Sequence, residues 1–292
     1  LDSDRERNSA EVDRAIELAS RHRNIERVVI GNEVVLRGDL PQEELFAHLA
    51  RVRKATRQPV STAEPWHVWI DHPELARHVD FIAVHMLPYW EGVPVEDAVS
   101  YIADKMQRLE AAFPGKPIVI GEVGWPSDGR TRESAVATPT NQALFLRRFL
   151  DHARREGYPY YIMEAFDQPW KERSEGRVGA YWGVYDADRV QKFDFSAPIV
   201  RVPGWHSLAA GSVVVSVLLL GLFYFHSRTL RKRGRSFLAV VVYATATLVT
   251  WILYDLSQQY LTVTGVLVGF VLLVGMTGVI AVLLAEAHEW AE

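Results

Sequence analysis

Short runs of apolar and β-branched residues recur along the first 200 residues, and segments with the periodicity of an amphipathic helix separate them. The strand-like runs lie at 27–31, 59–62, 81–84, 117–120 and 160–163, and the helical segments at 10–21, 41–56, 94–113 and 141–156. Near-continuous apolar strands separated by helices are typical of a parallel sheet covered by helices. The pattern therefore predicts an α/β fold for this part of the chain.

Each predicted strand ends in a polar or acidic residue: Asn32 with Glu33, then Glu64, His85, Glu122 and Glu164. In a (β/α)8 barrel the catalytic groups lie at the carboxyl ends of several strands. A doubly wound sheet would instead carry a glycine-rich phosphate loop, and no G-x-G-x-x-G or Walker motif occurs. We therefore expect a (β/α)8 barrel. Five of its eight strands are visible, so we expect a fragment that lacks about the first three βα units.

The chain changes character near residue 204, because the runs 202–227, 236–254 and 256–285 contain no Lys, Arg, Asp or Glu. Apolar stretches of about 20 residues suit transmembrane helices. We therefore expect a barrel domain at 1–203 and a membrane region at 204–292, with spans at about 208–226, 236–254 and 261–285. Five basic residues lie between the first two runs, at 228, 231–233 and 235. By the positive-inside rule they face the cytoplasm, which predicts a multi-pass inner-membrane protein with a periplasmic barrel domain.

Composition excludes several classes of function. The chain has no cysteine, so disulfides, thiolate metal sites and a cysteine nucleophile are excluded. Its formal net charge of −4 gives no electrostatic reason to expect a nucleic acid partner. The ten histidines lack the spacing of a metal motif, and we predict neither a metal nor a cofactor.

Two of the strand-end acids suggest a specific chemistry. Glu33 follows the run VVIGN and Glu122 lies in IVIGEVGWP. Two carboxylates on one rim of a barrel can flank a glycosidic bond, one as proton donor and one as nucleophile. Strand-end placement alone leaves open a structural role for both acids.

Aromatic residues accompany these acids at the strand ends. Tyr and Trp bind sugars through an apolar ring face and a polar edge. Packing between the barrel and its loops is the alternative explanation for part of the set, which comprises Trp66, Trp69, Tyr89, Trp90, Trp125, Trp170, Tyr181 and Trp182.

Five motifs resemble glycoside hydrolase family 17, the β-1,3-glucanases, in its bacterial membrane-tethered branch. They are VIGNEVVLRGDL (29–40), STAEPWHVW (61–69), VHMLPYWEG (84–92), VIGEVGWPSDG (119–129) and MEAFDQPWK (163–171). The resemblance covers about residues 1–202. It implies that Glu33, after Asn32 on the fourth barrel strand, is the acid/base, and that Glu122 on the seventh strand is the nucleophile.

The resemblance also implies a wider set of substrate-binding residues: Asn32, Glu64, Trp66, His85, Tyr89, Trp90, Trp125, Glu164, Asp167, Gln168, Trp170 and Lys171. His85 and Tyr89 then follow the sixth strand, and Lys171 follows the eighth. Plant members carry a glutamate where this chain has Gln168, and the resemblance implies that either Asp167 or Glu164 takes over its hydrogen bonds to the acid/base. Members of this branch resemble fusions with a family 2 glycosyltransferase, which implies such a domain further along the polypeptide.

The sequence thus predicts a retaining endo-β-1,3-glucanase or a β-1,3-glucan transglycosylase. The expected partners are β-glucan chains and a lipid bilayer. Two alternatives stay open: another retaining β-glucan hydrolase, for example one acting on β-1,4 links, and a non-catalytic glycan-binding module attached to a membrane glucan synthase.

Overall fold

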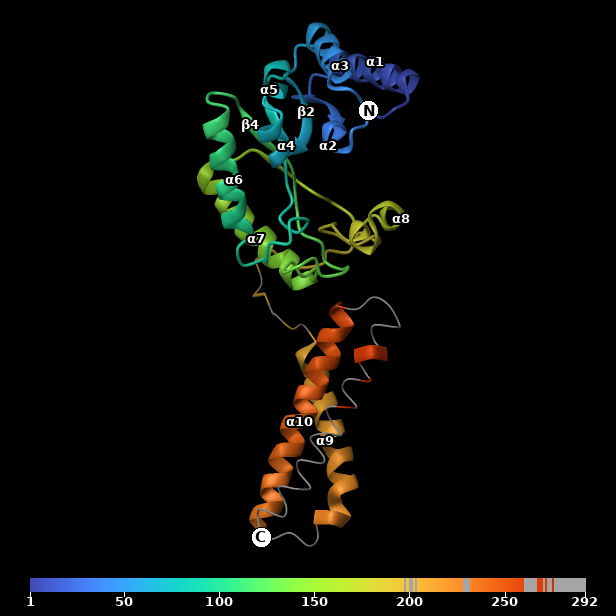
Figure 1. The fold of residues 1–292 in the computed structure, drawn as a ribbon, viewed down its shortest axis with the longest axis vertical. Helices are drawn as coiled ribbons and strands as arrows, with labels where there is room; N and C mark the ends of the chain where they lie inside the picture. Colours follow the sequence, from blue (N-terminus) through green and yellow to red (C-terminus); the bar gives the residue numbers. More distant parts are fainter. Residues whose placement is uncertain are drawn as a thin grey trace. The chain divides into compact units, whose positions relative to one another are not determined.

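The structure is a computed structural model that describes residues 1–196, 198–199, 202, 204–227, 232–259, 267–269, 271 and 275. The chain divides into two compact units, Leu1–Ala197 and Pro198–Glu292. The sequence analysis places the corresponding boundary between residues 203 and 204. Figure 1 shows the chain coloured from its N-terminus to its C-terminus.

The first unit is built on a parallel sheet of five strands whose spatial order, β1-β2-β3-β4-β5, is also their order in the sequence (Figure 1). The strands are β1 (Val28–Asn32), β2 (Val60–Pro65), β3 (Ile82–Met86), β4 (Ile118–Val123) and β5 (Tyr160–Ile162). All four pairings are parallel. A doubly wound sheet would reverse its strand order at a switch point, and this sheet does not. It is part of a (β/α)8 barrel, and β1 and β5 are its edges within the described residues.

The register of the sheet is irregular near the carboxyl ends of its strands. It shifts between Val29 and Asn32 on β1, between Val84 and His85 on β3, and between Ile120 and Val123 on β4. Such bulges bend a strand and re-aim its side chains, and they are common beside active sites. The backbone at the ends of β1, β3 and β4, which carry Asn32, His85 and Glu122, therefore departs from regular strand geometry.

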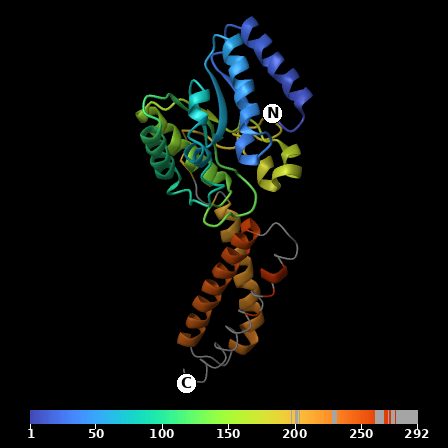
Figure 2. The ribbon, with the colours of Figure 1, turned by 45° about the horizontal axis from the view of Figure 1, so that its top comes forward.

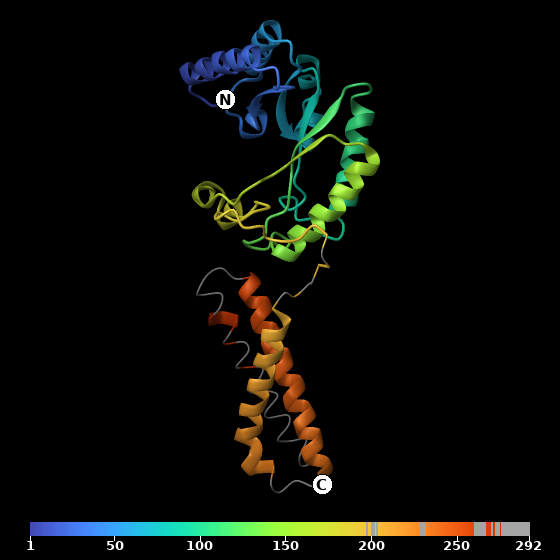
Figure 3. The ribbon, with the colours of Figure 1, turned by 180° about the vertical axis from the view of Figure 1, so that it is seen from behind.

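Four long helices connect and cover the strands: α1 (Arg5–Arg21), α3 (Gln42–Ala55), α6 (Ala98–Ala112) and α7 (Pro139–Glu156). Helices α1 and α3 lie side by side (Figure 2), and so do α6 and α7 (Figure 3). Helix α1 begins five residues before its apolar periodicity, because the Asp4 side chain accepts the Arg7 N–H at 3.0 Å and caps it.

Six short helices follow strand ends, where the sequence analysis expected loops: α2 (Val34–Arg37), α4 (Trp66–Asp71), α5 (Leu75–His78), η1 (Pro169–Lys171), α8 (Glu172–Glu175) and η2 (Arg177–Ala180). One or two turns are too short to show a helical period. The core lies between the sheet and the long helices, and its largest fully buried side chains include Trp69, Trp125, Trp182, Phe145 and Phe149.

The second unit contains helices α9 (Trp205–Ser227) and α10 (Lys232–Gln259), which pack on each other. Ser212 and Ser216 of α9 are buried, as are Val242 and Ala246 of α10. These helices cover the first two predicted membrane spans, 208–226 and 236–254. Within the part of the chain that the structure describes, however, no helix is long and apolar enough to cross a membrane. The third predicted span, 261–285, lies largely outside the described residues.

Candidate active site

Glu33 occupies a sharp turn between β1 and the one-turn helix α2. Its backbone has φ 54° and ψ 33°, in the left-handed region, and it is the N-cap residue of α2. Gly31, two residues earlier, has φ +87°, and a Cβ there would lie 2.9 Å from Cγ2 of Val34. Left-handed backbone at a non-glycine residue costs free energy and is concentrated at functional sites. The turn therefore fixes where the Glu33 carboxylate lies.

Glu64 of β2 holds this turn through hydrogen bonds to the backbone that follows it. Its side chain is fully buried, and its carboxylate accepts the N–H groups of Val35 at 2.8 Å and Leu36 at 3.2 Å. These donors open helix α2 and have no partner within the helix. Burial raises the pKa of Glu64, and the two backbone hydrogen bonds act in the opposite direction. With both oxygens bound to backbone, Glu64 positions the Glu33 turn.

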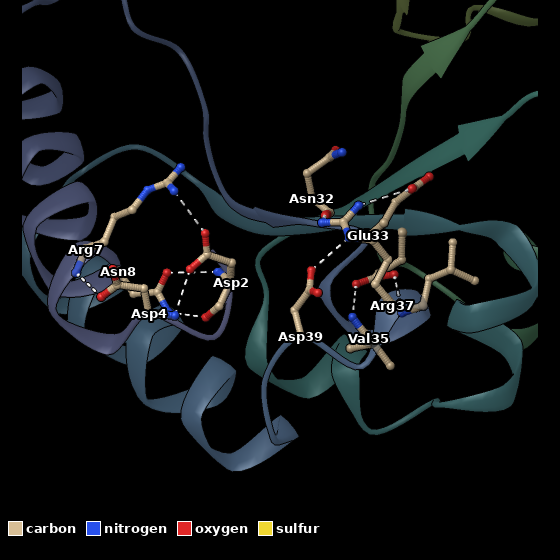
Figure 4. A network of polar contacts seen from close by, with 11 residues as sticks. Asp2, Asp4, Arg7, Asn8, Asn32, Glu33, Val35, Arg37 and Asp39 are labelled. Carbon is tan, nitrogen blue, oxygen red and sulfur yellow. Dashed lines mark hydrogen bonds and ion pairs between the residues drawn. The ribbon is translucent and has the colours of Figure 1, made fainter. Parts of the chain in front are cut away.

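Arg37, at the end of α2, reaches back to the same turn (Figure 4). Its guanidinium lies 3.4 Å from Oε2 of Glu33 and donates to the backbone carbonyl of Asn32. Its Nε donates to Oδ2 of Asp39 at 2.8 Å. Asn32 itself contributes its backbone to this network, and the residue is exposed.

His85 of β3 lies between the two predicted catalytic acids. Its Nδ1 is 3.0 Å from Oε1 of Glu33, and its Nε2 is 3.7 Å from Oε1 of Glu122 on β4. The residue is only 3% exposed, so its ring has little freedom to leave this position. The two carboxylates thus flank one imidazole at the carboxyl edge of the sheet.

The two acids have opposite electrostatic environments. The hydrogen bond from His85 lowers the pKa of Glu33, and Arg37 and His67 lower it further. Burial raises the pKa of Glu122, and the negative charge of Glu33 adds to this increase. In the ligand-free protein, protonation of Glu122 is therefore favoured over protonation of Glu33.

Glu164 and Lys171 form an ion pair on the Glu122 side of the site. Lys171 Nζ lies 2.8 Å from Oε2 of Glu164, and the Gln168 amide donates to the same oxygen. Lys171 lowers the pKa of Glu122, whereas Glu164 raises it. Asp167 points elsewhere: it is buried and accepts from Lys192 Nζ at 2.5 Å and from the Gly183 N–H at 2.9 Å. The partners of the Glu33 carboxylate are His85 and Arg37, and neither Asp167 nor Glu164 bonds to it among the described residues.

The predicted aromatic residues fall into two groups. Tyr89 and Trp125 are fully buried and hydrogen bond to the carbonyls of Arg130 and Val136. Their rings belong to the core, so neither presents a free face to a sugar. Trp90 lines the cavity described next, and Trp170, 67% exposed, donates to Gln168 at 2.9 Å.

A cavity of about 420 Å³ opens beside Glu33 and His85. Arg132 stacks at 5.8 Å over the Trp90 ring, and Glu91 accepts from the Trp66 indole N–H at 3.0 Å. The sequence analysis did not select six of the lining residues: Leu36, Pro65, His67, Leu87, Glu91 and Arg132. Except for Arg132, each of them lies at the carboxyl end of a strand or within a few residues after it, which is a signal that the sequence does contain.

Among the described residues, no group of three or more His, Asp or Glu side chains is arranged to hold a metal ion. The groups that the structure brings together at this edge of the sheet are the carboxylates of Glu33 and Glu122 and the imidazole of His85. Two carboxylates on either side of one imidazole, with a cavity beside Glu33, suit a reaction that needs one proton donor and one anionic group.

Comparisons with known proteins identify the domain. Residues 1–183 match the family model of the BtgE/BtgC glycoside hydrolase domain. A glucan 1,3-beta-glucosidase of Schizosaccharomyces pombe is 30% identical over 187 residues, which are 59% of this chain and 58% of that protein. The cell surface mannoprotein MP65 of Candida albicans is 28% identical over 169 residues, 56% and 44% of the two chains. The chain spans about three fifths of the length of the first of these relatives.

Comparison with solved structures also indicates a glycoside hydrolase fold. The glycoside hydrolase family 17 beta-1,3-glucanosyltransferase from Rhizomucor miehei superposes with a TM-score of 0.61 at 26% identity, over 68% of this chain and 74% of that one. An endo-laminarinase from Formosa Hel1_33_131 shares the fold, with a TM-score of 0.55 at 19% identity over 63% and 60% of the chains. The resemblance to glycoside hydrolase family 17 is thereby confirmed, and the chain belongs to the BtgE/BtgC family of glycoside hydrolase domains.

Proposed function

We propose that this domain cleaves β-1,3-glucan with retention or transfers glucan chains, with Glu33 as acid/base and Glu122 as nucleophile. The observation that carries the proposal is the placement of both carboxylates on either side of His85, beside a cavity that Glu33 lines. Relatives named glucan 1,3-beta-glucosidase and beta-1,3-glucanosyltransferase support the choice of substrate. One of the latter was solved as an active-site mutant in complex with laminaritriose.

The first half-reaction needs a protonated Glu33 and an ionised Glu122. Glu33 gives its proton to the glycosidic oxygen, the bond to the leaving sugar breaks, and a Glu122 oxygen forms a bond to the anomeric carbon. In the second half-reaction the Glu33 carboxylate takes a proton from water or from a sugar hydroxyl. The oxygen so activated attacks the anomeric carbon and releases Glu122.

The cavity supports transfer to a sugar as well as hydrolysis. Because Glu33 handles the proton of both the leaving and the entering oxygen, the cavity beside it lies where a leaving sugar departs and an acceptor enters. The Trp90 ring offers an apolar surface there, and Glu91 offers a hydrogen-bond acceptor. A sugar bound in this cavity competes with water for the glycosyl intermediate, which favours transglycosylation.

The roles are tested with Glu33→Gln and Glu122→Gln in the full chain. Both variants should lose at least about 10²-fold in turnover on laminari-oligosaccharides, the scale of a lost acid/base or nucleophile. With an activated aryl glycoside no proton is needed by the leaving group, so Glu33→Gln should form the intermediate and azide should rescue its breakdown. Glu122→Gln should stay inactive on that substrate.

Glu44→Gln serves as the matched control, since Glu44 lies on α3 and pairs with Arg5. Full activity in either active-site variant, or equal rescue of both by azide, would contradict the assignment. Product analysis with laminari-oligosaccharides separates shorter hydrolysis products from longer transfer products. The same assay on β-1,4-glucan tests the linkage.

We also propose that the domain acts outside the cytoplasm, where glucan polymers are available to it. A relative named as a cell surface mannoprotein supports this location. Activity of intact cells toward added laminarin, lost when the domain is removed, is the expected result. The lipid bilayer and a glycosyltransferase domain stay predicted partners.

A further inference from the structure

Arg37 contacts the Glu33 turn at two points although its side chain is 45% exposed. Its guanidinium binds the carbonyl of Asn32 and lies 3.4 Å from Oε2 of Glu33. Oε1 of the same carboxylate faces His85 at 3.0 Å. The two oxygens of Glu33 therefore have different partners: Arg37 from the helix that follows the turn (Figure 4) and His85 from strand β3.

Asp39 fixes the direction of the Arg37 side chain. It accepts the Arg37 Nε–H at 2.8 Å, which leaves the terminal nitrogens of the guanidinium directed at Asn32 and Glu33. A planar fork held at one nitrogen aims its remaining donors with little further loss of entropy. An isolated ion pair on the surface has no such fixed geometry, whereas the Arg37 guanidinium is held by Asp39 while it contacts the Glu33 turn.

We propose that Arg37 is a positioning residue that holds Glu33 in its ionised form, ready to act as the base of the second half-reaction. The inference rests on the proposed role of Glu33 as acid/base. A fixed cation beside one oxygen both orients the carboxylate and stabilises its charge. Arg37 thus favours the step that begins with a carboxylate and disfavours the step that begins with the protonated acid.

Other charged groups face Glu33 from the elements around it: His85 on β3, His67 on α4, Glu64 on β2, Glu122 on β4 and Glu175 on α8. The carboxylates disfavour ionisation of Glu33, whereas His85, first through its hydrogen bond, and His67 favour it. Arginine keeps its charge at every accessible pH. Arg37 therefore supplies a constant attraction across the whole pH range of activity.

In the second half-reaction the Glu33 carboxylate accepts the proton of the acceptor hydroxyl. The acceptor oxygen forms its bond to the anomeric carbon, and the bond from that carbon to Glu122 breaks. Loss of Arg37 should slow this step and make protonated Glu33 persist to higher pH. The free enzyme, whose ionisations kcat/KM reports, holds its first proton on Glu122. Protonation of Glu33 therefore sets the acidic limb of kcat/KM, and this limb should move to higher pH.

The experiment compares Arg37→Gln and Arg37→Lys with the wild-type full chain. On the acidic limb, kcat/KM of Arg37→Gln relative to its own maximum should be about two- to fivefold below the wild-type value, a modest effect because the pair is partly solvated. Arg37→Lys keeps the charge and should restore most of the wild-type profile. Arg53→Gln is the matched control, since Arg53 is 39% exposed and lies 2.6 Å from Asp80 on the far end of the sheet.

A second measurement does not depend on activity. Titration of the Glu33 carboxyl carbon by NMR, assigned with Glu33→Gln, should move to higher pH in Arg37→Gln and not in Arg53→Gln. An unmoved titration, or equal shifts in Arg37→Gln and Arg37→Lys, would overturn the proposal. If the wild type has no activity on glucan, the proposed function fails, while the titration still decides whether Arg37 stabilises the Glu33 carboxylate.

Discussion

Replacing Glu64 by alanine tests whether the buried carboxylate holds the turn that carries Glu33. The substitution removes the acceptor of the Val35 and Leu36 N–H groups, which bond to it at 2.8 and 3.2 Å. Hydrogen bonds to a charged group contribute about 1.5–3 kcal/mol each. Leu36 is exposed, so water can replace its bond in part, and removal of a buried charge offsets some of the loss.

We therefore expect Glu64→Ala to lower the free energy of unfolding of the barrel unit by about 3 kcal/mol. For a unit of this size that corresponds to a fall of roughly 6–12 °C in its melting temperature. Glu64→Gln keeps one acceptor oxygen but directs an N–H₂ group at the second backbone N–H. Its loss should be about half as large.

The assay is thermal unfolding followed by tryptophan fluorescence, combined with turnover on laminari-oligosaccharides well below the melting temperature. Because Glu33 caps the helix that Glu64 holds, Glu64→Ala should also lose at least about tenfold in kcat. Glu74→Ala is the control, because Glu74 is a partly exposed glutamate that lies 3.4 Å from His72. Two results would contradict the proposed support of the Glu33 turn by Glu64. One is a melting temperature of Glu64→Ala within about 2 °C of the wild type, and the other is an equal loss of stability in Glu64→Gln and Glu64→Ala.

Three further substitutions test the site and its scaffold. Gly31→Ala should lower both stability and kcat, because φ is +87° there and the new Cβ would lie 2.9 Å from Cγ2 of Val34; a normal melting temperature would contradict this. Burial raises the pKa of Glu122 above its ordinary value of 4.5, so the folded state binds this proton more tightly and loses stability as pH rises from 4.5. Glu122→Gln should therefore be more stable than the wild type at pH 7.5 and lose that gain toward pH 4.5; a gain that is largest at low pH would contradict the sign. The Thr138 hydroxyl caps α7 by accepting the Asn141 N–H at 3.1 Å. Thr138→Ala should therefore lower the free energy of unfolding in urea by about 1 kcal/mol without changing KM.

The regular elements of the barrel unit were predictable because they repeat a period. The predicted strand at 117–120 is found as Ile118–Val123, and the predicted helix at 141–156 as Pro139–Glu156. Continuous apolar runs and 3.6-residue periodicity are local signals that survive without tertiary information. The one-turn helix α2 has no period, and it exists because Glu64, 29 residues from Val35, accepts its first N–H groups.

The site shows the same division between local and distant information. The strand-end rule selects Glu33, His85 and Glu122, because parallel strands bring their carboxyl ends together. It does not reveal Arg37, whose role depends on a left-handed turn, and it selects Trp125, which the structure buries in the core. Whether an aromatic residue after a strand faces the cavity or the core depends on the bulges and helices around it, and these are tertiary features.

The pKa directions of the two acids raise a question about the reaction, because the free protein favours a proton on Glu122 and the proposed roles need it on Glu33. We infer that substrate relocates this proton. A sugar in the cavity removes water from Glu33, whose side chain is 25% exposed, and so raises its pKa. Once Glu33 is protonated, it no longer raises the pKa of Glu122 through its negative charge. Binding of a laminari-oligosaccharide should then exchange almost no proton with the buffer at a pH between the measured pKa values of Glu33 and Glu122, as followed by calorimetry in buffers of different ionisation enthalpy. Uptake of a full proton on binding would refute this relocation, because the acid of the first step would then come from solvent.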